Sequence, residues 1–125
     1  MMIKGLGIDL VDIKRIEEII NKRGLAFLKK VFTPQEIEYC ESKAARYQHY
    51  AARFAAKEAV VKMLAEVEGV GWKEIEVLKG DDGKPELSLS GQARIVADKL
   101  GIKRLHMSIS HEKELAIVQV IGEGD

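Results

Sequence analysis

The spacing of apolar residues changes along this chain of 125 residues, and this change constrains the fold more than any other feature. Four isoleucines between residues 13 and 20 recur at helical spacing. In the second half of the chain, Ile75 and Val77 alternate with charged residues, which is typical of a half-buried strand. An opening strand, then helices, then mostly strands predict an α+β fold, with the N-terminal strand and helices packed on a mostly antiparallel sheet.

Capping and turn residues set the expected bounds of these elements. Thr33-Pro34-Gln35-Glu36 has the form of a capping box with proline at the first helical position. Asp12 can cap the first helix and Ser90-Gly91 the last, while Asp82-Gly83 supplies the turn of a hairpin. The expected helices cover residues 13–23, 25–32, 34 onward, 46–68 and 91–100. The expected strands cover residues 2–10, 105–111 and 115–121, with the hairpin built on residues 75–77 and 87–89.

Length and composition limit the class of protein. A chain of this length predicts a single domain, residues 1–125. The longest uncharged stretch, residues 115–122, is far shorter than the roughly 20 residues of a membrane helix. Early charges argue against a secretory signal, and the single cysteine, Cys40, cannot form an internal disulfide. We therefore expect a cytoplasmic protein without a membrane partner.

The charges are balanced in number but not in position. The net charge of zero argues against a general nucleic-acid binder. Residues 1–62 hold 12 Lys and Arg against 8 Asp and Glu, whereas residues 63–125 hold 8 against 12. This asymmetry is compatible with a partner that recognises one face, although it is also common in small proteins.

Asp9 is the first candidate functional residue. It comes at the end of the expected opening strand, where a carboxylate is poorly solvated unless a cation or hydrogen-bond donors accompany it. The alternative is an exposed aspartate, or one that accepts backbone hydrogen bonds in the turn toward Asp12.

Glu58 is the second candidate. On a helix, Phe54, Glu58 and Lys62 fall on one face, each four residues from the next. The simplest interpretation is a solvated Glu58–Lys62 ion pair, worth a few tenths of a kcal/mol. The other is functional: the carboxylate holds a hard cation while the lysine neutralises phosphate oxygens. Spacing alone leaves both open and favours the ion pair.

Two polar segments in the second half could also contact a ligand. Ser108-Ile109-Ser110-His111 places two serines on one strand face, and His111 could bind a phosphate. A serine hydrolase is disfavoured because no Gly-x-Ser-x-Gly elbow is present. The segment around Gly83-Lys84-Pro85 is a turn whose free backbone groups could contact a base or a sugar.

These motifs together resemble the bacterial holo-[acyl-carrier-protein] synthases of the 4′-phosphopantetheinyl transferase superfamily. The opening Gly5-Leu6-Gly7-Ile8-Asp9-Leu10-Val11-Asp12-Ile13 is similar to the first family signature, and Arg53-Phe54-Ala55-Ala56-Lys57-Glu58-Ala59 with Lys62 to the second. Trp72-Lys73-Glu74-Ile75-Glu76-Val77, Gly83-Lys84-Pro85 and Ser108-Ile109-Ser110-His111 follow in the family order. The resemblance covers nearly the whole chain.

The resemblance implies a phosphopantetheinyl transferase fold and a Mg²⁺-dependent reaction. Family members transfer the 4′-phosphopantetheine group of coenzyme A to a serine of apo-acyl carrier protein, in fatty acid biosynthesis, and release adenosine 3′,5′-bisphosphate. Asp9 and Glu58 match the two metal ligands, and Lys62 would stabilise charge at the diphosphate. For the base that takes the serine proton, a metal-bound water or hydroxide is the first choice and Glu58 acting directly is the second.

The remaining ligand contacts also follow from the resemblance. Coenzyme A would contact Arg53, Lys62, Ser110 and His111, with the Gly83-Lys84-Pro85 turn at the adenine. The acidic carrier protein would meet a basic patch, Lys14, Arg15, Lys22 and Arg23, whose charges would speed encounter more than they add affinity. Small family members resemble homotrimers with sites between subunits. The alternatives are a non-catalytic coenzyme A or nucleotide-binding module and a purely structural oligomerisation domain.

Overall fold

The α+β class is confirmed by a computed structural model that describes residues 1–65 and 68–125. The helices of the described chain are α1 (Ile13–Arg23), α2 (Leu25–Val31), α3 (Pro34–Glu41), α4 (Arg46–Leu64), the short 3₁₀ turn η1 (Trp72–Glu74) and α5 (Gly91–Lys99). The strands are β1 (Met2–Asp12), β2 (Ile75–Lys79), β3 (Pro85–Leu89), β4 (Arg104–His111) and β5 (Leu115–Gly124). In this part of the chain, no helix combines the length and hydropathy needed to cross a membrane.

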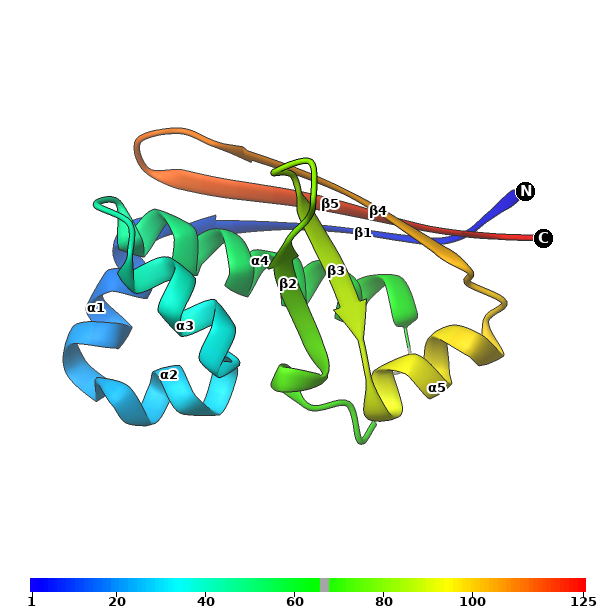
Figure 1. The fold of residues 1–125 in the computed structure, drawn as a ribbon, viewed down its shortest axis with the longest axis horizontal. Helices are drawn as coiled ribbons and strands as arrows, with labels where there is room; N and C mark the ends of the chain where they lie inside the picture. Colours follow the sequence, from blue (N-terminus) through cyan, green and yellow to red (C-terminus); the bar gives the residue numbers. More distant parts are fainter. Residues whose placement is uncertain (66–67) are drawn as a thin grey trace.

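The antiparallel pairing is divided between two sheets. β1 and β4 flank β5 in a three-stranded sheet, and β2 pairs with β3 in a separate hairpin. Figure 1 shows α4 running beneath the larger sheet, with α1, α2 and α3 at one end and the hairpin and α5 toward the other. The larger sheet therefore joins the first strand of the chain to the last two.

Two predicted boundaries require correction. β1 continues to Asp12, so Asp9 lies within the strand opposite Val118 and not at its end. The long helix ends at Leu64, before the predicted Glu68, because Ala65 adopts a left-handed conformation with φ of 63°. Residues 66 and 67 of the predicted helix lie outside the described residues.

The caps of the helices follow the sequence at two of three places. Asp12 accepts a hydrogen bond from the Lys14 amide at 3.0 Å, and the capping box of α3 is present. Ser90 precedes α5 as predicted, but its side chain makes no capping hydrogen bond. Glu74 supplies it instead, accepting from the Ala93 amide at 3.2 Å.

Glycines bring β1 into direct contact with α4. A Cβ atom on Gly7 would lie 1.9 Å from the carbonyl oxygen of Ala59, and one on Gly5 would lie 2.8 Å from that of Met63. Larger side chains at these positions would force the strand and the helix apart. The Gly-x-Gly segment therefore sets the distance between β1 and α4.

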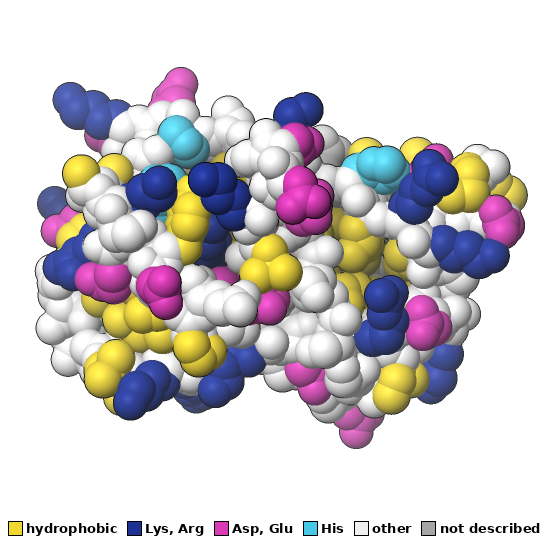
Figure 2. All heavy atoms as spheres, viewed as in Figure 1, with side chains coloured by type: hydrophobic (Ala, Val, Ile, Leu, Met, Phe, Trp, Pro, Cys, Tyr) yellow, Lys and Arg dark blue, Asp and Glu magenta, His cyan; other side chains and the backbone are white. Residues whose placement is uncertain are grey.

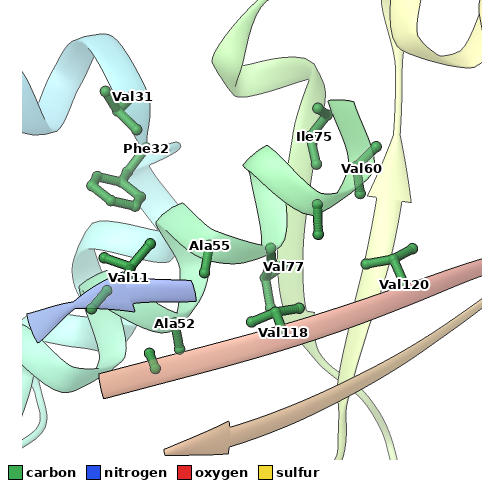
Figure 3. Close-up of a cluster of buried hydrophobic side chains, with 14 of the residues drawn as sticks. Val11, Val31, Phe32, Ala52, Ala55, Val60, Ile75, Val77, Val118 and Val120 are labelled. Atoms are coloured by element: carbon green, nitrogen blue, oxygen red, sulfur yellow. The ribbon is translucent and has the colours of Figure 1, made fainter. Parts of the chain in front are cut away.

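Alanines bring the rest of α4 close to its neighbours. Five of them are buried along the helix: Ala51, Ala52, Ala55, Ala56 and Ala59. In Figure 3, Ala55 lies between Phe32 of the N-terminal helical region and Val118, and Ala52 lies beside β5. Small side chains allow close packing on several sides, so α4 becomes the central element from which polar side chains reach different surfaces.

Candidate functional site

A hollow of about 360 Å³ lies between the end of β1, α1 and α4. We call it the carboxylate hollow. Its polar residues are Asp9, Asp12, Arg15 and Glu58, and its apolar wall includes Phe54 and Trp72. The rings of Phe54 and Trp72 are stacked, with centroids 5.2 Å apart. The hollow thus combines acidic groups with an aromatic wall.

Asp9 reaches this hollow from the sheet face that packs on α4. It lies two residues beyond Gly7, and alternation along the strand places both on that face. Its carboxylate is largely shielded, with 13 % of the side chain exposed, and Lys62 Nζ lies 3.0 Å from its Oδ1. Lys62 also donates to the carbonyl of Ile8 at 3.0 Å. Asp9 is thus a strand carboxylate paired with a cation from α4, and not the exposed aspartate considered above.

Glu58 lies one helical turn before Lys62 and shares the hollow with Asp9. Burial raises the pKa of Glu58, and the negative charge of Asp9 raises it further, while Lys62 partly opposes both. In the described ion pairs, Lys62 contacts Asp9 and not Glu58. The simple Glu58–Lys62 pair is therefore replaced by a cluster of two carboxylates and one lysine.

The chemistry of this cluster fits a divalent cation. Two carboxylates whose charges repel each other would be stabilised by a positive ion between them. Burial is the main cause of the raised pKa of Glu58, and repulsion by Asp9 adds to it. Mg²⁺ is usually bound through one or two carboxylates together with substrate phosphates and water. The described residues contain no group of three or more His, Cys, Asp or Glu side chains that could hold a metal ion. Asp9 and Glu58 match the smaller number of carboxylates that Mg²⁺ needs.

A second hollow, of about 400 Å³, lies between α3, α4, β4 and the tip of the β2–β3 hairpin. We call it the basic hollow. Its cationic and histidine side chains are His49, Arg53, Lys79, Lys84 and His111, and none of the described residues that line it is acidic. Figure 2 shows histidine, lysine and arginine side chains gathered between the β4–β5 turn and the hairpin tip. Such a surface attracts anions.

Arg53 is the buried group of the basic hollow. The residue is 5 % exposed, and its guanidinium lies over the ring of Tyr39 at 4.2 Å. Its Nε atom is buried without a hydrogen-bond partner in the protein. A buried donor without a partner is costly, so a bound anion is the natural acceptor.

The turn residues and His111 meet at the same hollow. Gly83, Lys84 and Pro85 line it, and Gly83 has a φ of 82°, which favours glycine in this turn. The ring of His111 lies 2.8 Å from Nε2 of Gln48. The structure therefore brings together Arg53, the hairpin turn and His111, which are far apart in the sequence.

Sequence reasoning missed several residues of both hollows. His49 is four residues before Arg53, so helical spacing could have found it. Burial lowers the pKa of His49, as do the nearby charges of Arg53, Lys43 and His111. Tyr39 and Lys79 come from distant elements and carry no local signal. Trp72 belongs to one of the motifs that resemble the family, but the sequence alone indicates no role for it.

Some residues predicted to contact coenzyme A do not lie together within one chain. Ser110 is exposed and lines neither hollow, and Lys62 reaches Asp9 but not the basic hollow. The two hollows share no lining residue. The basic residues predicted to meet a partner are all exposed on α1: Lys14, Arg15, Lys22 and Arg23.

Comparison with known proteins identifies the family. A model of the 4′-phosphopantetheinyl transferase superfamily matches residues 5–118. The chain is 48 % identical over 123 residues to a holo-[acyl-carrier-protein] synthase of Halothermothrix orenii, covering 98 % of both chains. It is 50 % identical over 125 residues to one of Syntrophus aciditrophicus, again covering 98 % of both.

A solved structure with a bound ligand has the same fold as this chain. The holo-(acyl-carrier-protein) synthase from Bacillus anthracis, in complex with CoA (3′,5′-ADP), matches with a TM-score of 0.80 and 33 % identity over 100 % of both chains. Identity of this extent over whole chains, together with the shared fold, is enough to assign this chain to a family. The chain belongs to the 4′-phosphopantetheinyl transferase superfamily and, within it, to the holo-[acyl-carrier-protein] synthases.

Proposed function

We propose that this enzyme transfers the 4′-phosphopantetheine group of coenzyme A to a serine of apo-acyl carrier protein, with Mg²⁺, for fatty acid biosynthesis. The products are holo-acyl carrier protein and adenosine 3′,5′-bisphosphate. The observation that carries this proposal is that Asp9 and Glu58 line one hollow, with Lys62 paired to Asp9. Family membership favours this transfer over a non-catalytic coenzyme A or nucleotide-binding module.

Asp9 and Glu58 are the residues that would hold the metal ion. When bound, Mg²⁺ supplies positive charge to the diphosphate and orients its oxygens. The shielding of Asp9 limits competition from water, which strengthens its attraction for a cation.

The chain's own groups then supply charge and a proton acceptor. Lys62 is placed beside Asp9 to neutralise the non-bridging phosphate oxygens as the serine oxygen attacks phosphorus. The P–O bond to the adenosine 3′,5′-bisphosphate leaving group breaks in the same displacement. Among the chain's own groups at the hollow, Glu58 is the candidate acceptor for the serine proton, second to water that the metal would hold.

The basic hollow would hold the nucleotide end of coenzyme A. Arg53 offers a buried donor without a partner, and His111 lines the same hollow, so the 3′-phosphate is the expected ligand of this pair. The turn Gly83-Lys84-Pro85 would contact the adenine. Ser110 stays a predicted contact of coenzyme A that one chain does not bring to this hollow.

A homotrimer with sites between subunits would bring the two hollows of different copies together. The outer face of the larger sheet exposes Leu6, Ile8, Leu10 and Ile117, which are each between 38 and 57 % exposed. An apolar patch of this kind is typical of a protein–protein interface. Because the two hollows share no lining residue, a second copy that covers this face could supply the nucleotide contacts.

The acidic carrier protein would dock on α1. Arg15 is both exposed and part of the carboxylate hollow, so the basic face of α1 leads directly to the proposed reaction site. Opposite charges on the partner would speed encounter and set its orientation.

The deciding experiment measures transfer by intact mass. The protein is incubated with coenzyme A, Mg²⁺ and apo-acyl carrier protein, with and without a chelator, and compared with Asp9→Asn. We expect the carrier protein to gain the mass of one phosphopantetheine group, and to gain none with the chelator or with a folded Asp9→Asn variant. Unchanged transfer by Asp9→Asn would contradict the assigned role of the cluster, and loss of its fold would indicate a structural one.

A further inference from the structure

Lys57 precedes Glu58 in the sequence but points into the protein interior. The side chains of Lys57 and Glu36 are both completely buried, and Lys57 Nζ lies 2.8 Å from Glu36 Oε1. This ion pair lies outside both hollows, and the proposed reaction does not use it. Lysine and glutamate are rarely buried to this extent.

Every donor of the Lys57 ammonium has a protein acceptor. Besides Glu36, it donates to the carbonyl of Trp72 at 3.1 Å and to the carbonyl of Ile75. Glu36 in turn accepts from the amides of Thr33 at 3.0 Å and Val77 at 2.9 Å. One lysine of α4 therefore ties together α3, the turn η1 and the start of β2.

Stability alone is a weak explanation for such a pair. Desolvation of two charges offsets much of their attraction, and replacement by apolar residues of similar size is often neutral or stabilising. What an apolar residue cannot replace is the pair of hydrogen bonds that fix the carbonyls of Trp72 and Ile75.

The carbonyl held by Lys57 belongs to the residue that forms the wall of the carboxylate hollow. The ring of Trp72 stacks on Phe54 at an interplanar angle of 24°, and Phe54 lies one turn before Glu58 on α4. Both rings line the hollow that contains Glu58. Lys57 therefore connects the backbone of Trp72 to the helix that carries Glu58.

We propose that Lys57, paired with Glu36, is a positioning residue that holds Trp72 against Phe54 and so keeps the wall beside Glu58 closed. The closed wall excludes water and orients the reacting groups next to Glu58. This inference rests on the proposed function for the reaction that it supports, but the position of Trp72 can be measured without that reaction.

The test compares Lys57→Met with the double variant Lys57→Met/Glu36→Gln. The single variant leaves Glu36 buried without its cation, so its stability should fall. The double variant removes both charges, and the amide oxygen that replaces the carboxylate can still accept a hydrogen bond, so its stability should return toward that of the wild type. Neither variant can hold the carbonyl of Trp72. Lys73→Met, which replaces an exposed lysine in the same turn, is the matched control.

Trp72 is the only tryptophan in the chain, so its fluorescence reports on the wall directly. We expect acrylamide to quench it more strongly in both Lys57 variants, with kcat lower by about tenfold or more and KM less affected. The decisive expectation is that the double variant regains stability without regaining kcat or the protection of Trp72. If the single variant does not fold, the double variant carries the test.

Two outcomes would overturn the inference. One is wild-type kcat in the stable double variant, because a merely structural pair would restore activity together with stability. The other is unchanged quenching of Trp72 in a folded variant without Lys57. If the wild-type protein itself shows no transfer, the proposed function fails, whereas the quenching comparison still decides the role of Lys57.

Discussion

Replacement of Gly7 by alanine should separate the two elements that carry the proposed reaction site. The added Cβ atom would lie 1.9 Å from the carbonyl oxygen of Ala59 and 2.9 Å from the backbone nitrogen of Met63. All of these are main-chain atoms of α4, so no side chain can rotate away. Ordinary contact begins near 3.4 Å, which requires a displacement of about 1.5 Å between β1 and α4.

The magnitude of this displacement predicts two effects. Overpacking of a well-packed core costs about 1–3 kcal/mol, and we expect the upper end because both backbones are held by their neighbours. Activity should fall further than stability suggests. Asp9 lies on β1 while Glu58 and Lys62 lie on α4, and a misplacement of about 1 Å can reduce the rate by about 100-fold.

The assay combines denaturation by guanidinium chloride with the transfer reaction at saturating substrates. Gly71→Ala is the matched control, because its Cβ would meet nothing closer than Glu74 at 3.9 Å and its φ is −93°. That control should change stability by less than about 1 kcal/mol and leave the rate unchanged. A Gly7→Ala variant with the denaturation midpoint and rate of the wild type would refute the reasoning.

Three further variants test the proposed roles of Glu58, of Arg53 and of the basic residues on α1. Glu58→Gln should abolish transfer and yet stabilise the metal-free protein by about 0.5–1 kcal/mol at pH 7. The raised pKa of Glu58 means that the folded state disfavours its carboxylate. The gain in stability should therefore vanish below pH 4.5, the ordinary pKa, where the carboxyl group is protonated in both the folded and the unfolded state. Denaturation curves that still show the gain below this pH would contradict the prediction. Arg53→Met should raise KM for coenzyme A by about 10- to 100-fold but leave KM for 3′-dephospho-coenzyme A unchanged. Equal effects on both KM values would show that the 3′-phosphate does not bind in the basic hollow. Arg15→Glu/Arg23→Glu should lower kcat/KM for the carrier protein and weaken its salt dependence, and turnover at sub-saturating carrier protein that stays unchanged and insensitive to salt would exclude docking on α1.

The fold was largely predictable because its signals are local. Apolar spacing, the capping box at Thr33 and the Asp82-Gly83 turn each act within a few residues, and the corresponding elements are present. The prediction failed where a distant residue decides the local structure. The cap of α5 comes from Glu74 and not from Ser90, and no pattern around Ser90 indicates this.

The candidate site was predictable in part, for the same physical reason. Helical spacing placed Glu58 and Lys62 on one face, but the contact of Lys62 with Asp9 spans 53 positions and depends on the close approach at Gly7. The family resemblance supplied what spacing could not, since it matched Asp9 with Glu58 although the two residues are far apart in the sequence. Lys57 received no role because a lysine next to a glutamate normally indicates a solvated surface.

The geometry of α4 explains how neighbouring residues of one helix serve different purposes. Successive residues project about 100° apart, so Arg53 and Glu58, five positions apart, point about 140° away from each other. Arg53 and Lys57 share a side that faces α3, whereas Glu58 faces β1 and α1. The effect of a substitution on α4 should therefore depend on the side from which the residue projects. Substitution of Arg53 should affect coenzyme A binding, and substitution of Glu58 should affect turnover. Substitution of Lys57 should affect turnover through Trp72, because Lys57 donates a hydrogen bond to the carbonyl of Trp72, whose side chain lines the hollow that contains Glu58.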